Sequence, residues 1–383
     1  MIGLLFGAAL VLFFVGAVGL PAVVWLDRRL QANVAGGVRT PAPDGDESGL
    51  LVLLRPFSEA RRMLARPDPI DPAAAPIAAR LAPLVGLFAG LGAFALIPFG
   101  GRYAIGHEPI SLVVADPPWG GLGVVVAAAA AGLGVALTGI AGARTGSLLG
   151  GVRAAVQSMA GVLALTASLL PMWVLFETMQ PSAIGAWQDA VIPLAGWLAR
   201  VGVELPAWWP AGFGLPAWGL FINPLAFALF VAASLVVVGR PPFDAAFSRT
   251  ELAGGVLSEL SGFRRLAVLV ADHVWTLVLA GLATLVFLGG WSIPWLTQST
   301  LVGAIEPYYG SGFAELVCAV AHVGCFLTKL AGMVFAMLSI RWSFPRLRAD
   351  QVMALCFRLL VPLGLLDAWL TIAVAIALGG QTP

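Results

Sequence analysis

The residues best suited to acid–base chemistry gather in one polar segment of an otherwise apolar chain. This polar segment, GRPPFDAAFSRTELAGGVLSELSG (239–262), contains five charged residues: Arg240, Asp244, Arg249, Glu251 and Glu259. Glu251 and Glu259 are eight residues apart, which on a helix places them near one face, about two turns apart. Two such carboxylates near a membrane boundary raise each other's proton affinity, as a proton relay requires. The same spacing also suits structural carboxylates that neighbouring arginines neutralise, so both interpretations stand.

Asp272, His273, Lys329 and Asp367 are ionisable residues that lie inside apolar runs. A charge at the centre of a membrane helix costs roughly 2.5–3.5 kcal/mol on insertion scales, so it faces a polar interior or pairs with another group. A proton or ion path is one interpretation. A buried structural pair is the other, and the sequence alone leaves both open.

Metal and nucleic-acid chemistry are not indicated. The three histidines are far apart in sequence, and Cys318, Cys325 and Cys356 lie in apolar runs without metal-ligand spacing. The net charge of +1 implies no nucleic-acid partner. We therefore expect no metal site and assign the cysteines to packing.

The elements that must position these groups are membrane helices. The chain has 383 residues, of which 60% are hydrophobic and 11% charged, and its mean hydropathy is +0.94. Its apolar runs are continuous rather than alternating, which predicts spanning helices and excludes a β-barrel. We predict an all-α integral membrane protein with about eight transmembrane helices, at 2–26, 81–100, 121–140, 153–176, 220–238, 266–289, 314–340 and 353–378. The third of these runs is rich in Gly and Ala, which favours close helix packing.

The arginines predict the orientation of the chain. They crowd into alternate loops, and the positive-inside rule places those loops in the cytoplasm and both termini outside. We expect a single membrane domain over 1–383 in a bacterial cytoplasmic (inner) membrane. Within it, 38–48 reads as a flexible insert, 50–66 as an amphipathic interfacial helix on the cytoplasmic side, and 239–265 as a charged cytoplasmic loop.

The motifs of the chain resemble those of one family, the H subunit (mitochondrial subunit 1) of respiratory complex I, the proton-pumping NADH–quinone oxidoreductase. The polar segment is similar to that family's signature loop, E-x-N-R-A-P-F-D followed by E-L-V-A-G-Y-x-x-E-Y-S-G. Six other stretches resemble family motifs in chain order: LDRRLQANVAGG (26–37), LRPFSEARRML (54–64), SLLGGVRAAVQ (147–157), FLGGW (287–291), RWSFPRLRADQVM (341–353), which follows Lys329, and LVPLGLLD (360–367), with Asp367 in place of the family's Asn. The resemblance covers almost the whole chain.

The resemblance implies an eight-helix subunit where the membrane arm meets the peripheral arm, with a quinone tunnel lined by the first, amphipathic and sixth helices. It assigns quinone binding to Arg29, Asn33, Phe57, Glu59, Arg62 and Asp272. It assigns proton coupling to Asp244, Glu251, Glu259, Asp272 and Lys329. It assigns docking to the peripheral arm to Arg240, Arg346 and Arg348.

The resemblance also implies the cofactors and partners. The chain binds a quinone, ubiquinone or menaquinone, as substrate and carries no covalent cofactor, while iron–sulfur clusters and flavin belong to partner subunits. Its partners are the other membrane-arm and peripheral-arm subunits and the lipid bilayer. It is part of an enzyme, a translocase, but has no complete active site and no catalytic residue of its own.

The polar segment departs from the family pattern in ways that keep alternatives open. Val237, Phe247 and Arg249 stand where the family has acids, and Asp272 replaces a glutamate. A membrane anchor subunit of a related nickel–iron hydrogenase or formate hydrogenlyase is therefore a second hypothesis. A stand-alone ion transporter is a third.

Overall fold

The protein is an all-α integral membrane protein, as predicted. The computed structural model describes residues 19–34, 51–72, 74–104, 110–142, 144–193, 214–240, 242–244, 255–258, 260–345 and 347–377. Within these residues, six helices are long and apolar enough to cross a membrane: Pro76–Ala95, Gly120–Ile140, Thr145–Phe176, Gly262–Phe287, Ser311–Arg341 and Ala349–Ala377. Each coincides with a predicted run, whereas the count of eight stays a prediction.

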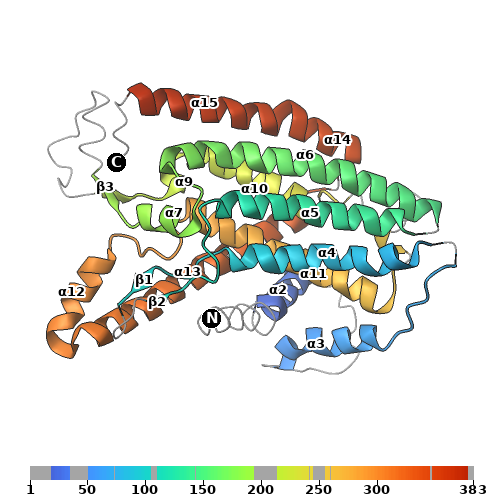
Figure 1. Ribbon diagram of the computed structural model, residues 1–383, viewed down its shortest axis with the longest axis horizontal. Helices are drawn as coiled ribbons and strands as arrows, with labels where there is room; N and C mark the ends of the chain where they lie inside the picture. The colour runs from blue at the N-terminus through green and yellow to red at the C-terminus, as the bar shows by residue number, and fades with distance from the viewer. Residues whose placement is uncertain are drawn as a thin grey trace.

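The helices form a layered bundle around one central helix. Helices α4 (Pro76–Ala95), α5 (Gly120–Ile140), α6 (Thr145–Phe176) and α15 (Val361–Ala377) lie side by side in that order (Figure 1). A short helix α14 (Ala349–Leu355) and a π-helical turn η3 (Cys356–Leu360) lead into α15. Helix α11 (Gly262–Phe287) packs against α4 and is buried along most of its length. The core therefore centres on α11.

Helices α5 and α6 approach each other closely because small residues line their contact. A Cβ atom added at Gly139 would lie 2.5 Å from the Cα atom of Gly151. Only glycine permits this backbone contact, so the Gly- and Ala-rich composition of the third run has the packing role expected of it.

The predicted helix at 220–238 is divided in two. A short helix α9 (Gly219–Ile222) precedes α10 (Pro224–Val238), and Asn223 separates them. The Asn223 side chain accepts a hydrogen bond from the backbone N–H of Ala226, which caps α10. Helix α10 ends at Gly239, whose φ of 68° is favourable only for glycine. The polar segment begins at this glycine.

Two amphipathic or partly polar helices lie beside α11. Helix α2 (Leu20–Val34) contains the end of the first predicted run, and α3 (Leu51–Leu64) occupies the place of the expected helix at 50–66. Both contact α11, and α2 also contacts α13 (Ser311–Ser343) (Figure 1). These helices surround the candidate site.

The opposite end of the bundle carries short elements that the sequence did not indicate. They are β1 (Arg102–Tyr103) paired with β2 (Ile110–Ser111), β3 (Val191–Pro193) paired with β4 (Gly214–Pro216), α7 (Pro181–Trp187) and α12 (Gln298–Tyr309). Helix α12 forms a hairpin with α13 that projects from the bundle (Figure 1). A 3₁₀ turn, η2 (Val256–Ser258), lies in the polar segment.

Candidate functional site

A cavity with charged walls lies among α2, α3 and α11, and we call it the α2–α3–α11 cavity. Its volume is about 380 Å³. The apolar part of its wall comprises Leu20, Pro21, Val24, Pro56, Phe57, Ala60, Met63, Leu266, Leu269 and Val270. The polar and charged part comprises Asp27, Arg28, Glu59, Arg240, Asp272, His273 and Arg341. An apolar cavity with a few convergent polar groups is the usual form of a small-molecule site.

Ion pairs join the helices that bound this cavity. Arg28 on α2 pairs with Glu59 on α3 through both carboxylate oxygens. Arg341, near the end of α13, donates from Nη1 to Oδ2 of Asp27 at 2.7 Å. The first ion pair joins α2 to α3, and the second joins α13 to α2. The shape of the cavity therefore depends on these charges.

A further charged pair at this cavity is Arg240 with Asp272. Arg240 Nε donates to Asp272 Oδ2 at 2.5 Å, and Arg240 is only 5% exposed. Within the described part of the chain, neither Nη1 nor Nη2 of Arg240 has a hydrogen-bond partner, and neither does Oδ1 of Asp272. Buried donors without partners are costly, so these atoms suit a bound polar ligand or water.

A second, smaller cavity, which we call the inner cavity, lies on the other side of Asp272. Its volume is about 70 Å³, and residues of α4, α5, α6, α10 and α11 line it, including Thr138, Gln157, Ser158 and Asp272. Gln157 Nε2 donates to the carbonyl oxygens of Val236 and Phe243, at 3.2 and 2.6 Å. Its Oε1 has no hydrogen-bond partner among the residues described. Asp272 therefore belongs to the walls of both cavities.

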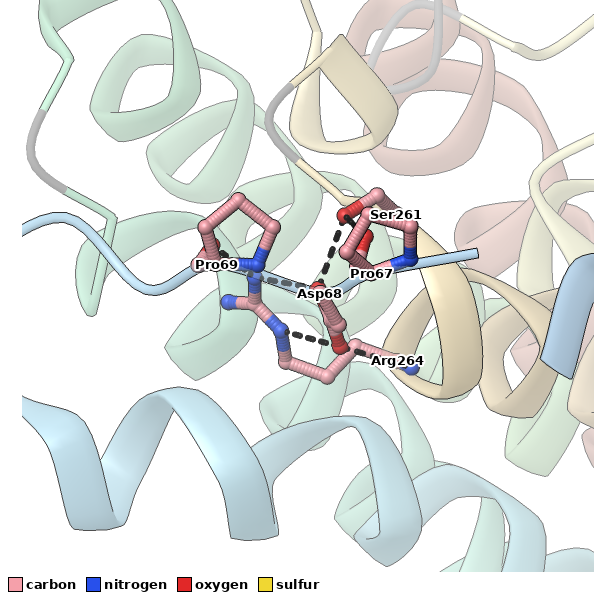
Figure 2. Close-up of polar contacts among 5 residues, drawn as sticks. All are labelled: Pro67, Asp68, Pro69, Ser261 and Arg264. Carbon is pink, nitrogen blue, oxygen red and sulfur yellow. Dashed lines mark hydrogen bonds and ion pairs between the residues drawn. The ribbon is translucent and has the colours of Figure 1, made fainter. Parts of the chain in front are cut away.

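A polar cluster fixes the connection between α3 and α4 against the start of α11. Arg264 donates to both carboxylate oxygens of Asp68, from Nη2 at 2.6 Å and from Nε at 2.9 Å, and Ser261 Oγ donates to Oδ1 at 2.9 Å (Figure 2). Arg264 Nη2 also reaches the carbonyl of Pro69. Burial would raise the pKa of Asp68, but the hydrogen bonds from Arg264 and Ser261 outweigh it and hold that pKa below its usual value. The cluster anchors the chain that leads out of α3, and with it one wall of the cavity.

The structure separates the residues expected to bind quinone. Phe57, Glu59 and Asp272 line the α2–α3–α11 cavity. Arg29 is exposed on α2, with its guanidinium 5.1 Å from the centre of the Trp25 ring, and Arg62 is exposed on α3. Neither arginine is part of the cavity wall. The backbone of Asn33 lies in α2, but its side chain is outside the described part.

The docking residues are likewise separated. Arg240 does not suit docking to another subunit, because its side chain is buried and faces Asp272. Arg348 is exposed immediately before α14, as docking requires. Arg346 lies outside the described residues.

The residues expected to couple protons do not all gather at the cavity. Glu251 and Glu259 lie outside the described residues, and Asp244 is half-buried beside Phe243. Lys329 lies on α13, next to the turn that follows the C-terminal end of α11. Its Nζ donates to the carbonyls of Ser292 and Gly290 in that turn, at 2.6 and 3.2 Å.

Lys329 is far from Asp272 along the bundle. Phe287, the last residue of α11, is 15 residues beyond Asp272, or about 22 Å along the helix axis. Lys329 is therefore not part of the cavity.

Sequence reasoning missed several residues of the cavity wall and of its supports, namely Asp27, Arg28, Gln157 and Arg341 in the walls and Asp68 in the anchoring cluster. Asp27 and Arg28 lie within the motif at 26–37, and Gln157 and Arg341 within two others, so motif membership was the available signal. Asp68 follows a proline and precedes one, which gives no local indication of a partner 196 residues away.

The structure is thus a membrane protein, an apolar helical bundle with a charged cavity beside an amphipathic helix, and the form of that cavity suits a small, partly apolar ligand. A family model described as NADH dehydrogenase matches residues 7–372. The chain belongs to the NADH dehydrogenase family, and its resemblance to the H subunit of complex I is confirmed.

Three curated relatives, each named as the H subunit of NADH-quinone oxidoreductase, extend this match. That of Bdellovibrio bacteriovorus is 27% identical over 94% of this chain and 93% of its own length. That of Syntrophotalea carbinolica is 30% identical over 84% and 82%, respectively. That of Thermomicrobium roseum is 30% identical over 91% and 89%. The similarity therefore extends over most of this chain and most of each relative.

Proposed function

We propose that this chain is the membrane subunit of an NADH–quinone oxidoreductase that receives the quinone in the α2–α3–α11 cavity. The family and the names of the curated relatives support the complex. The buried Nη groups of Arg240, which have no hydrogen-bond partner among the described residues, and the apolar part of the cavity wall support the site. Either carbonyl oxygen of a quinone head accepts hydrogen bonds of the kind these groups donate, and the apolar wall suits the isoprenoid tail.

Reduction of a quinone consumes two protons, and the second part of the proposal concerns their movement. Asp272 borders the α2–α3–α11 cavity and the inner cavity, so a proton held on its carboxylate has access to both. The inner cavity has room for a few water molecules, and Gln157 Oε1 offers them an acceptor. Quinone chemistry in one cavity is thereby coupled to proton movement into the bundle, toward the polar segment and its carboxylates Asp244, Glu251 and Glu259.

The setting of the subunit follows from its arginines. Arginine-rich loops face the cytoplasm of a bacterial inner membrane, the α3 side of the bundle lies at the cytoplasmic surface, and both termini lie outside. The peripheral-arm subunits, which carry the flavin and the iron–sulfur clusters, dock on that surface near Arg348. The other membrane-arm subunits and the bilayer cover the apolar flanks.

Filling the cavity tests the quinone site. Val24→Trp and Val270→Trp enlarge side chains on opposite walls, α2 and α11, and Val320→Trp adds the same ring to a 66% exposed position on α13. In membranes containing the assembled complex, both cavity variants lose NADH–quinone turnover but retain NADH oxidation by ferricyanide, which bypasses the quinone. The Val320 control keeps both activities.

Two results would contradict the proposal. The first is full quinone turnover in both cavity variants. The second is a nickel–iron centre instead of flavin in the purified complex, which would favour a hydrogenase anchor subunit.

Glu251→Gln tests the coupling. The expected result is that fewer protons are translocated per NADH oxidised in sealed vesicles. An unchanged ratio would remove Glu251 from the path.

A further inference from the structure

A row of ionisable side chains follows one face of α13, far from the α2–α3–α11 cavity. We call it the α13 polar stripe, and it comprises Glu315, Cys318, His322, Cys325 and Lys329. Their spacings of three and four residues place them on the same side of the helix, each next to the following one. That side faces β1 and the turn that follows α11.

The centre of the stripe is a buried hydrogen-bonded pair. The Tyr103 hydroxyl on β1 lies 2.7 Å from Nδ1 of His322, and the two residues are 1% and 0% exposed. Cys318 Sγ lies 3.7 Å from Nε2 of His322. The Gly101 backbone N–H donates to the same hydroxyl oxygen at 3.1 Å. Neutral imidazole and phenol can each donate and accept a proton, so this pair can relay one.

Lys329 forms the inner end of the stripe. Its Nζ lies 4.1 Å from the centre of the Trp218 ring as well as against the Ser292 carbonyl. Cys325 Sγ donates to that same carbonyl at 3.4 Å. Since Cys325 is three residues from His322 and four from Lys329, it bridges the interval between them.

Carboxylates form the outer end of the stripe. Gln298 Nε2 donates to Glu315 Oε2, and its backbone N–H donates to Asp189 Oδ2, each at 3.3 Å. Both carboxylates are only partly buried, so they reach solvent. Desolvation raises the pKa of Asp189 and that of Tyr103, which favours the protonated form of each. The stripe therefore runs from solvent to the half-buried ammonium group of Lys329.

We propose that the α13 polar stripe, together with Tyr103, is a proton path between Lys329 and the surface at the end of the bundle opposite the α2–α3–α11 cavity. A proton leaves Lys329 Nζ and reaches His322 past Cys325. The imidazole releases its other proton to the Tyr103 oxygen, and the hydroxyl proton passes on toward Glu315 and Asp189. Each transfer breaks one N–H or O–H bond and forms another, so no oxidant or reductant is needed.

The test rests on the proposed function, because it uses the whole complex in inverted membrane vesicles driven by NADH. Tyr103→Phe removes one hydroxyl, and Tyr308→Phe makes the same change at an 81% exposed position on α12. The double variant Tyr103→Phe/His322→Phe removes both members of the buried pair, so neither the hydroxyl nor the imidazole is left without the other. Two quantities are measured: NADH–quinone turnover, and protons translocated per NADH.

We expect both Tyr103 variants to translocate fewer protons per NADH at unchanged quinone turnover, and the Tyr308 control to match the wild type. If the pair were only structural, assembly and turnover would fall while the ratio stayed at its wild-type value, and the proposal would be overturned. If the single variant does not assemble, the double variant decides: a wild-type number of protons translocated per NADH in the double variant also overturns the proposal. Retained quinone turnover in either case leaves the proposed function of the α2–α3–α11 cavity intact.

Discussion

The Arg240–Asp272 pair gives an asymmetric prediction for protein stability. Asp272→Ala leaves the Arg240 guanidinium, 5% exposed, without its carboxylate. Since arginine stays protonated, it cannot relieve this by losing its charge. Removing one partner of a buried ion pair costs about 3–5 kcal/mol, and we expect Asp272→Ala to lower the free energy of unfolding by that amount.

The reverse change should cost less. Arg240→Met leaves Asp272, which is 23% exposed in its side chain and can become neutral by binding a proton. The expected loss is about 1–3 kcal/mol, the cost of an unsatisfied polar group. The double variant Arg240→Met/Asp272→Leu replaces both charges with apolar side chains and should lie within about 1 kcal/mol of the wild type.

Unfolding of the purified chain in mixed micelles, titrated with SDS, measures all three variants against the wild type. The decisive quantity is the coupling between the two sites, which is the difference between the double variant and the sum of the single variants. We expect it to be several kcal/mol. Additive losses, or equal losses in the two single variants, would refute the reasoning that the pair is desolvated and mutually dependent.

Two further predictions concern stability alone. Asp68→Asn should lower the free energy of unfolding by about 1.5–3 kcal/mol at pH 7, the value of hydrogen bonds to a charged group. Because the native pKa of Asp68 is depressed, this stabilisation is present above the unfolded-state pKa and disappears as the pH falls below about 4. The pH dependence of unfolding, with the exposed Glu306→Gln as control, checks it, and a difference that persists in acid would contradict it. Gly139→Ala should cost about 1–3 kcal/mol because its Cβ meets backbone atoms of α6, whereas Gly92→Ala, with open space around it, should cost nothing; equal stabilities would disprove the close contact.

Much of the bundle was predictable because membrane helices are recognisable in a sequence as long apolar runs. Helix α11 is an example: its run is apolar, and its boundaries follow from Gly262 and the turn at Gly289 and Gly290. Helix α12 was not predictable, because it contains a proline, Pro307, and makes a hairpin that buries none of its own residues. A helix that depends on a single neighbour has little signal in its own sequence.

The candidate site was predictable in part. Resemblance to a family brought Phe57, Glu59 and Asp272 together as residues of one cavity, which no local pattern could do. The position of Arg240 was not foreseen, because a basic residue at the edge of a loop reads as a surface group. Its burial depends on where α10 ends and on how the bundle closes over it, and these are tertiary effects.

The length of α10 has a consequence for the depth of the whole site. Its 15 residues extend about 22 Å, whereas the hydrocarbon core of a bilayer is about 30 Å thick. Helix α10 alone is therefore too short to cross that core, and the chain leaves the helical conformation at Gly239, directly before Arg240. Irregular backbone is tolerated there because protein surrounds it: the Pro242 carbonyl accepts a hydrogen bond from the backbone N–H of Leu347. One extra turn in α10 would move Arg240 about 5 Å along the axis, away from Asp272, so the length of α10 sets where along the bundle the charged pair lies.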